Sequence, residues 1–282
     1  MADVHVRHRV GVRREGGRAV RVRTQCRTGV TPVLWIGTSF KMTKTRAESV
    51  AYAARLRSAL GEGLPGVQPF VIPPATALAE VSAVLCGEPR VLTGAQNAHW
   101  ADEGAWTGEI SVPQAADAGA RIIEIGHSER REHFGETDAT VARKVAATLR
   151  HGLTPLVCCG ESAEVFARGG SVDHVLGQVA AAFDGLTDTS RALIAYEPVW
   201  AIGEHGREPR PEETAAVHKA LAAEWGGRVA GVLYGGSVNP GNAARLLGVP
   251  GVDGLFVGRA AWDVEGCLAV LDIGRRHAAA AA

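Results

Sequence analysis

The sequence predicts an α/β protein built as a single (β/α)8 barrel. Short apolar runs rich in β-branched residues alternate with Ala/Leu/Glu/Arg-rich stretches of helical spacing, a pattern that indicates βαβ units and a parallel sheet. The runs are apolar almost throughout, which is typical of strands buried on both faces. Eight such units within about 240 residues also fit this barrel, whose usual length is ~250 residues.

The expected strands follow one another at similar intervals, with helical stretches between most of them, for example at 45–60 and 211–225. An open doubly wound sheet is the competing fold. It usually has a Gly-rich dinucleotide fingerprint after its first strand, and the segment 37–43 lacks the third spaced glycine. The strands are expected at 32–38, 67–72, 90–96, 121–127, 154–160, 192–198, 229–235 and 253–258.

The two ends of the chain differ from the region between them. Residues 1–30 carry eight arginines and no apolar h-region, so they do not form a secretory signal. They could form a nucleic-acid-binding or transit arm. We expect a disordered Arg-rich extension instead, because the segment has no apolar face to bury. The barrel is expected over 31–276 as one domain, followed by an Ala-rich tail at 277–282 without an assigned function.

Composition excludes several classes of function. The formal net charge is zero, whereas nucleic-acid binding needs a clear basic excess. No apolar stretch approaches the ~20 residues that cross a bilayer. The five cysteines form neither a paired framework nor a Cys-x-x-Cys metal spacing, which indicates reduced thiols and a cytoplasmic location. We therefore expect a small-molecule partner, no nucleic acid, no membrane and no metal site.

Polar residues gather where the expected strands end. In a closed barrel all carboxyl ends of the strands open onto one face, where barrel active sites lie. Residues distant in sequence therefore converge there. The candidates are Ser39 and Lys41 after the first strand, His127 and Glu129 after the fourth, Glu197 after the sixth, Ser237 after the seventh, and Gly258 and Arg259 after the eighth.

Two of these residues suggest proton transfer. Glu197 precedes an apolar segment that ends at Gly203, and closure of such a flap would desolvate the carboxylate and make it a stronger base. His127 could polarise a carbonyl as a neutral imidazole. Taken singly, each could be an ordinary strand-end residue. The glycines after the seventh and eighth strands offer backbone N–H groups for a phosphate. Together these features indicate proton abstraction beside a carbonyl on a small sugar phosphate.

The same residues lie in four motifs that resemble the triosephosphate isomerase family. They occupy 123–138, 196–203, 234–242 and 254–262, and the resemblance extends over roughly 33–272. It implies a cofactor-independent isomerase that works through an enediolate, and a homodimer. The resemblance implies that Glu197 is the base, His127 the electrophile, Lys41 the cation and Glu129 a supporting carboxylate. It also implies phosphate binding by Gly203, Ser237 and Gly258 and a lid at 198–203. Thr107 is implied to make a cross-interface contact near the partner subunit's lysine.

Three departures from the family pattern affect the substrate. Ser39 replaces an asparagine that lines the substrate, Gly258-Arg259 replaces a Gly-Gly pair, and 204–209 replaces the usual Thr-Gly-Lys continuation. With the segment 94–111, these changes resemble the branch of L-erythrulose-1-phosphate isomerases of tetritol (erythritol) breakdown. Its substrate is dihydroxyacetone phosphate extended by one hydroxymethyl group, and the smaller Ser39 could free volume for the added carbon.

Two other functions remain as alternatives. One is triosephosphate isomerase itself, acting on glyceraldehyde 3-phosphate and dihydroxyacetone phosphate. The other, more remote, is a non-catalytic phosphate-binding barrel, which would be expected to lack equivalents of Glu197 or His127, and both are present. We predict isomerisation of L-erythrulose 1-phosphate to D-erythrulose 4-phosphate.

Overall fold

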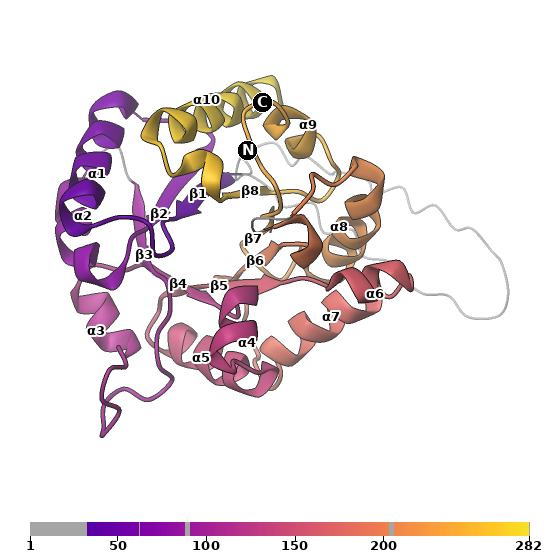
Figure 1. Cartoon of the computed structure of the whole chain (residues 1–282), viewed down its shortest axis with the longest axis horizontal. Coiled ribbons are helices and arrows are strands. Elements are labelled where there is room, and N and C mark those ends of the chain that lie inside the picture. The colour runs from indigo at the N-terminus through magenta and orange to yellow at the C-terminus, as the bar shows by residue number, and fades with distance from the viewer. Residues whose placement is uncertain (1–32, 62, 88–90, 203–205, 282) are drawn as a thin grey trace, which may run out of the picture. The chain divides into compact units, whose positions relative to one another are not determined.

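Eight parallel strands close into a barrel in sequence order, β1 to β8, with β1 pairing with β8. The computed structural model describes residues 33–61, 63–87, 91–202 and 206–281. All eight expected strands are confirmed, and helices ring the sheet (Figure 1). The strands are β1 (Leu34–Ser39), β2 (Val67–Ile72), β3 (Leu92–Ala95), β4 (Ile122–Ile125), β5 (Thr154–Cys159), β6 (Leu193–Tyr196), β7 (Gly231–Tyr234) and β8 (Gly254–Val257).

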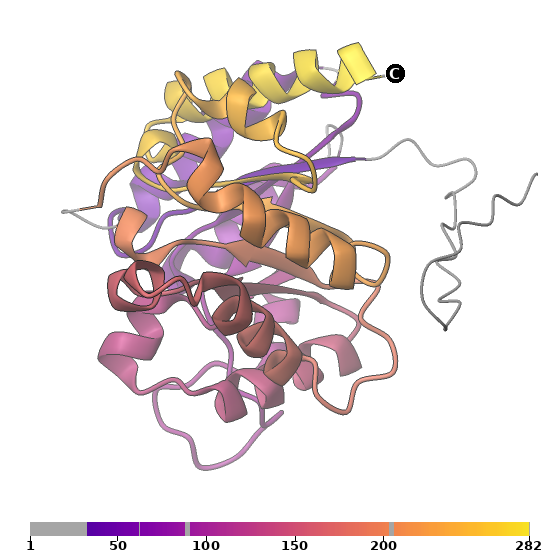
Figure 2. The same cartoon turned by 90° about the vertical axis from the view of Figure 1, so that its right-hand side faces the viewer.

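The longer helices run alongside the strands on the outside of the barrel (Figure 2). They are α1 (Arg46–Leu60), α2 (Leu78–Leu85), α3 (Val112–Asp117), α4 (Ser128–Phe134), α5 (Asp138–Arg150), α6 (Ala163–Ala167), α7 (Ser171–Ala182), α8 (Pro211–Trp225), α9 (Ala243–Leu247) and α10 (Val264–Ala281). Short 3-10 turns are η1 (Ala75–Ala77), η2 (Val199–Ala201) and η3 (Arg259–Ala261).

The helices begin where the sequence supplies N-cap residues. Thr45, Ser111 and Thr137 each accept a hydrogen bond from the third residue of the helix that follows, and each is part of a capping box. These caps satisfy backbone N–H groups that a helix start leaves unpaired. They fix the points at which α1, α3 and α5 leave the barrel rim.

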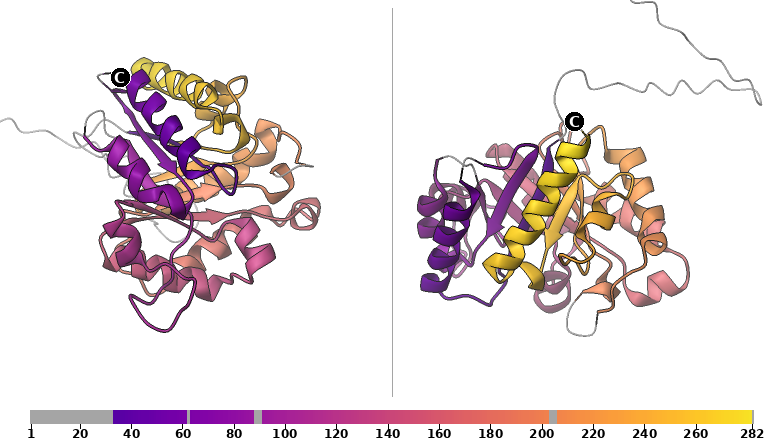
Figure 3. Two further views of the ribbon diagram at one scale, coloured as in Figure 1. Left: turned by 60° about the vertical axis from the view of Figure 1, so that its left-hand side comes forward. Right: turned by 90° about the horizontal axis from the view of Figure 1, so that it is seen from above.

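Both chain ends bear on the expected domain limits. The prediction for residues 1–30 lies outside the described residues. The predicted tail at 277–282 is not separate as far as Ala281, because α10 continues to that residue. Alanine is the strongest helix former, so the alanines extend the helix. Figure 3 shows α10 beside α1, and α10 packs against β1 and β2.

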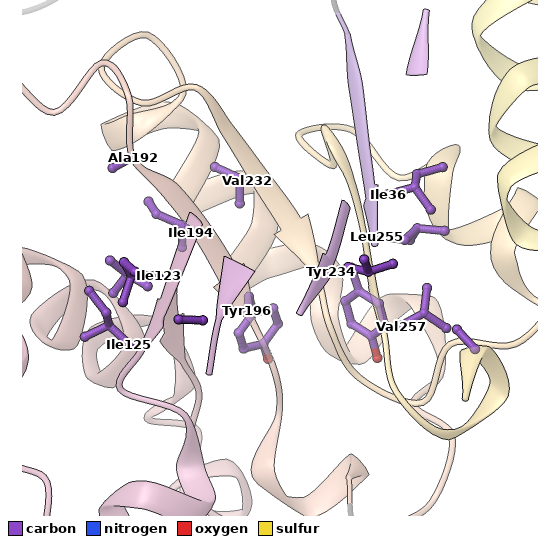
Figure 4. Packing of buried hydrophobic residues seen from close by; sticks show 14 of the residues in the cluster. Ile36, Ile123, Ile125, Ala192, Ile194, Tyr196, Val232, Tyr234, Leu255 and Val257 are labelled. Carbon is purple, nitrogen blue, oxygen red and sulfur yellow. The ribbon is translucent and has the colours of Figure 1, made fainter. Parts of the chain in front are cut away.

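Apolar side chains form two layers, one between the sheet and the helices and one inside the barrel. Alternation along each strand separates the layers. On β4, Ile123 and Ile125 belong to the outer layer (Figure 4), whereas Ile122 belongs to the inner one. The inner layer fills the barrel, so it is a packed core whose upper end supports the residues after the strands.

No helix in the described ranges is both long and apolar enough to cross a membrane.

Candidate active site

A cavity of about 430 Å³ opens at the carboxyl ends of the strands. Eight of the residues singled out in the sequence line it together, although they come from five different strand ends: Ser39, Lys41, His127, Glu129, Glu197, Ser237, Gly258 and Arg259. Gly203 lies outside the described residues, and Ile202 and Gly206 line the cavity on either side of that gap. The barrel thus brings two cationic side chains, an imidazole, two carboxylates and two glycine-rich loops to one site.

His127 and Glu197 form a buried pair in this cavity. His127 Nε2 lies 3.2 Å from Glu197 Oε2, and the two side chains are only 6% and 5% exposed. Glu197 follows β6 directly, and its own amide donates to the Cys159 carbonyl of β5. A carboxylate held this way is desolvated on most sides and faces the cavity beside the imidazole of His127, which suits a base that acts on a carbon acid.

The hydrogen bond at the second ring nitrogen of His127, Nδ1, determines which nitrogen of the neutral ring carries the proton. His127 caps the start of α4, where its Nδ1 accepts the backbone N–H of Glu129 at 3.2 Å. A nitrogen that accepts a hydrogen bond carries no proton, so the neutral ring has its proton on Nε2. That proton points to Glu197 and the cavity, where it can be donated to a substrate oxygen.

Two opposing effects set the pKa of His127. Burial lowers it, because the charged imidazolium is poorly solvated, and the carboxylates of Glu197 and Glu124 raise it. The net shift of the His127 pKa is upward, so the protonation of His127 depends on the charge of Glu197. Neutralising Glu197 removes the largest of the effects that raise the pKa and favours the neutral ring that donates through Nε2.

Lys41 is held in an unusual backbone conformation. Its φ is +49°, in the left-handed region that residues other than glycine seldom adopt. The side chain of Gln96 donates to the Lys41 carbonyl at 2.9 Å, and Lys41 Nζ donates to Glu129 Oε1 at 2.6 Å. Burial raises the pKa of Glu129, but the hydrogen bond from Lys41 and the nearby positive charges of His127 and Lys41 together outweigh burial, and the net shift is downward. The ion pair therefore keeps Glu129 charged and Lys41 directed at the cavity.

The segment after Glu197 is anchored on both sides. Trp200 Nε1 donates to Glu161 Oε1 at 2.9 Å, and Tyr196 Oη donates to the same oxygen at 3.2 Å. On the opposite side, Ser237 Oγ donates to the Ala201 carbonyl at 2.6 Å. The predicted lid segment is thus attached to the loop after β7, which carries part of the proposed phosphate site.

Small residues leave room for the Glu197 side chain and its backbone. A Cβ on Gly235 would lie 2.5 Å from Glu197 Cγ, and one on Gly160 would lie 1.8 Å from the Glu197 carbonyl oxygen. Neither distance is possible for real atoms, so only glycine fits at these two positions. The position of Glu197 is therefore fixed sterically as well as by hydrogen bonds.

The glycine loops differ in one detail from the expectation. The Gly235 amide donates to the Tyr196 carbonyl at 2.8 Å, so this N–H is committed to the sheet and is not available to a phosphate. Gly236, Ser237 and Gly258 follow and line the cavity. These residues are the better candidates for phosphate binding.

Thr107 lies elsewhere in the subunit. It is exposed in the loop between β3 and α3, which projects from the barrel (Figure 1), and it lines a separate hollow of about 360 Å³. Trp106 beside it is 50% exposed, and Met42 beside Lys41 is 98% exposed. The predicted role of Thr107 requires a partner subunit.

Three residues of the site were not singled out in the sequence: Gln96, Glu161 and Glu124. Glu124 had a visible signal, because it is the charged residue in the otherwise apolar strand at 122–125. Gln96 and Glu161 had none, since each acts through long-range contacts that depend on the closed barrel. In the described part of the chain, no group of three or more His, Cys, Asp or Glu side chains is placed to hold a metal ion.

Comparison with known proteins agrees with this geometry. A family model described as triosephosphate isomerase matches residues 34–274. A Mycolicibacterium smegmatis protein named L-erythrulose-1-phosphate isomerase is 56% identical over 247 residues, covering 86% of this chain and 94% of the relative. A Mesorhizobium japonicum protein of the same name is 50% identical over 254 residues, covering 88% of this chain and 98% of the relative.

A solved structure is also similar. The crystal structure of triosephosphate isomerase from Bartonella henselae aligns with a TM-score of 0.76 and 32% sequence identity, and covers 86% of this chain and 99% of that chain.

Proposed function

The chain belongs to the triosephosphate isomerase family, and we propose that it interconverts L-erythrulose 1-phosphate and D-erythrulose 4-phosphate without a cofactor. The observation that carries the proposal is the buried pair of His127 Nε2 and Glu197 Oε2, 3.2 Å apart, in a cavity that Lys41 also lines. The names of relatives that are 50–56% identical support the four-carbon substrate.

In the proposed reaction Glu197 removes the proton from C3, next to the C2 carbonyl of L-erythrulose 1-phosphate. The electron pair forms an enediolate across C2 and C3, and the charge developing on its oxygens is stabilised by the Nε2–H of His127 and by the Lys41 cation. Glu197 then returns its proton to C2, while the hydroxyl proton moves from the C3 oxygen to the C2 oxygen. The carbonyl is now at C3, which is C2 of D-erythrulose 4-phosphate.

The remaining site residues have supporting roles in this proposal. Gly236, Ser237 and Gly258, with Gly203, bind the phosphate through backbone N–H groups, and Arg259 adds positive charge beside them. Glu129 orients Lys41, and Ser39 leaves volume near the reacting carbons. The enzyme is proposed to be a cytoplasmic homodimer in which Thr107 reaches the partner's lysine.

A second candidate is triosephosphate isomerase itself. The solved structure of that name at 32% identity supports it, since the same residues would serve a three-carbon substrate. The higher identity to the proteins named L-erythrulose-1-phosphate isomerase favours the four-carbon substrate.

The proposal is tested by following L-erythrulose 1-phosphate in D2O by NMR. The expected result is formation of D-erythrulose 4-phosphate with deuterium at the carbon that becomes protonated, because Glu197 exchanges its proton with solvent while the enediolate is bound. The Glu197→Gln variant should form no product above background. Absence of product with the wild-type protein would refute the proposed function, and full activity of Glu197→Gln would refute the assigned base.

A further inference from the structure

Trp262 connects the two strand ends that carry the Lys41 cation and part of the proposed phosphate site. β1 and β8 pair in parallel, and their register ends at the pair Thr38 and Val257. One residue further along β1, the Ser39 carbonyl accepts a hydrogen bond from Trp262 Nε1 at 3.0 Å. Trp262 directly follows η3, the turn after β8. The indole therefore links the segment that leaves β1 to the segment that leaves β8.

A buried tyrosine supports the same junction from the side of α1. Tyr52 Oη donates to the Ala261 carbonyl at 2.8 Å, immediately before Trp262. The Tyr52 ring also packs edge-on against Phe40, with 4.7 Å between the ring centroids, and both side chains are buried. Close-packed buried rings do not shift independently of one another. The turn that carries Trp262 and the residue before Lys41 thus share one rigid support.

Three hydrogen bonds hold the backbone that leads to Lys41, and the indole bond is the first of them. In the second, the Phe40 amide donates to the Ile72 carbonyl at 2.9 Å. In the third, the Gln96 side chain donates to the Lys41 carbonyl at 2.9 Å. The left-handed φ of +49° at Lys41 persists only where surrounding contacts impose it. Loss of the indole bond should therefore let this segment relax and displace the Lys41 ammonium.

The Trp262 side chain also lines the cavity, together with Lys41 and Gly258. In the proposed reaction the substrate phosphate lies beside Gly258, and the reacting carbons lie beside Lys41. One substrate meets both groups only where their separation matches its length. A displacement of about 1 Å at a reacting centre costs on the order of 10²-fold in rate, so this separation affects catalysis directly.

We infer that Trp262 is a positioning residue whose indole N–H holds the Ser39 carbonyl and thereby sets where Lys41 lies relative to the phosphate site. This inference rests on the proposed function, since it takes Lys41 as the cation that stabilises the enediolate. That charge develops during the reaction and is absent from the bound substrate. Loss of the indole bond should therefore lower kcat more than it raises KM.

Two substitutions separate the hydrogen bond from the bulk of the ring. Trp262→Phe keeps an aromatic ring and loses the N–H, so kcat should fall about 10-fold, less than a full 1 Å displacement costs. KM, and the inhibition constant of inorganic phosphate as a competitive inhibitor, should stay within about 2-fold. Trp262→His is smaller, but its five-membered ring carries a nitrogen at the position of the indole N–H. At about pH 8, where imidazole is neutral, its kcat should return to within about 3-fold of wild type.

Trp225→Phe is the matched control. Trp225 belongs to α8 and is 4% exposed, and its Nε1 has no hydrogen-bond partner among the residues that the structure describes. The substitution removes the same atoms as Trp262→Phe without breaking a hydrogen bond, so kcat should stay within about 2-fold of wild type. Thermal melting of each variant checks its fold.

A kcat of Trp262→Phe equal to wild type, or a kcat of Trp262→His no higher than that of Trp262→Phe, would overturn the inference. Weaker phosphate inhibition in proportion to the loss of kcat would also overturn it, because Trp262 would then act on the phosphate site. The kinetics use whichever of L-erythrulose 1-phosphate and D-glyceraldehyde 3-phosphate the wild-type protein converts faster. A wrong four-carbon assignment therefore leaves the test of Trp262 intact.

An NMR measurement tests the inference without turnover. The 13C signal of the Lys41 ε-methylene group, assigned by its loss in Lys41→Arg, should shift in Trp262→Phe and stay in place in Trp225→Phe. An unchanged Lys41 signal in Trp262→Phe would overturn the positioning role whatever the reaction is. If the wild-type protein converted neither substrate while the Lys41 signal shifted as expected, the proposed function would fail and the positioning of Lys41 by Trp262 would stand.

Discussion

At the scale of single residues, the protonation of His127 depends on the charge of Glu197. The Glu197 carboxylate raises the pKa of His127 against the lowering effect of burial. Replacing Glu197 by Gln removes that charge, so the pKa of His127 should fall, and the neutral ring should persist to lower pH than in the wild-type protein. An NMR titration of 15N-labelled imidazoles measures this, with His127→Gln used to assign the signal. An unchanged or higher pKa in Glu197→Gln would show that the pair is not coupled.

Glu124 makes stability depend on pH. Its pKa is about 7 in the folded protein, above the ordinary carboxyl value of 4.5, so ionisation is easier in the unfolded chain and costs stability as pH rises from about 5 to 8. The glutamine side chain in the Glu124→Gln variant is uncharged over this whole pH range. The free energy of unfolding of this variant relative to wild type should therefore increase over this range by roughly 1–3 kcal/mol. Urea unfolding at several pH values measures it, and a pH-independent difference would show that Glu124 does not titrate in this range.

Residues such as His127, Glu197 and Lys41 could be predicted from sequence because each follows a readable apolar run, and a closed barrel makes all such ends converge. Glu124 is visible in the sequence as a charged residue in an apolar run, but strand alternation is needed to see that its side chain points into the barrel. The contacts of Gln96 and Glu161 depend on long-range geometry that no local pattern encodes. The commitment of the Gly235 amide to the sheet likewise follows from pairing of β6 with β7.

At the scale of elements, the loop after β7 helps to position Glu197, the proposed base, because Gly235 has no side chain that would displace it. Gly235→Ala should push Glu197 away from its place, because the new Cβ would otherwise lie 2.5 Å from Glu197 Cγ. A displacement of about 1 Å costs on the order of 10²-fold in rate, so kcat should fall by that order. Steady-state kinetics measures the effect.

Gly177→Ala is the matched control. Gly177 lies in α7, and its added Cβ would meet nothing within 4 Å. The variant should keep full activity and gain roughly 0.5–1 kcal/mol of stability, since alanine favours a helix interior. If Gly235→Ala kept wild-type kcat, steric positioning of Glu197 by this loop would be disproved.

At the scale of the whole molecule, the eight strands and their helices form one compact unit from Pro32 to Ala282. The ring closes where Trp35 pairs with Gly254, so the barrel needs nothing before Pro32 to complete its sheet. Deleting residues 1–31 should leave kcat/KM within about 2-fold and the sedimentation coefficient that of a dimer of the shortened chain. Loss of activity or of dimerisation would show that the Arg-rich segment belongs to the working enzyme.

The most direct test of the whole interpretation is a side-by-side measurement of kcat/KM for L-erythrulose 1-phosphate and D-glyceraldehyde 3-phosphate with the wild-type protein. We predict a preference for the four-carbon substrate of at least about 10²-fold, because a buried site built to hydrogen-bond a hydroxyl strongly disfavours a substrate that lacks it. A preference for the three-carbon substrate would contradict the proposed function and mean that Ser39 does not mark a site shaped for a fourth carbon.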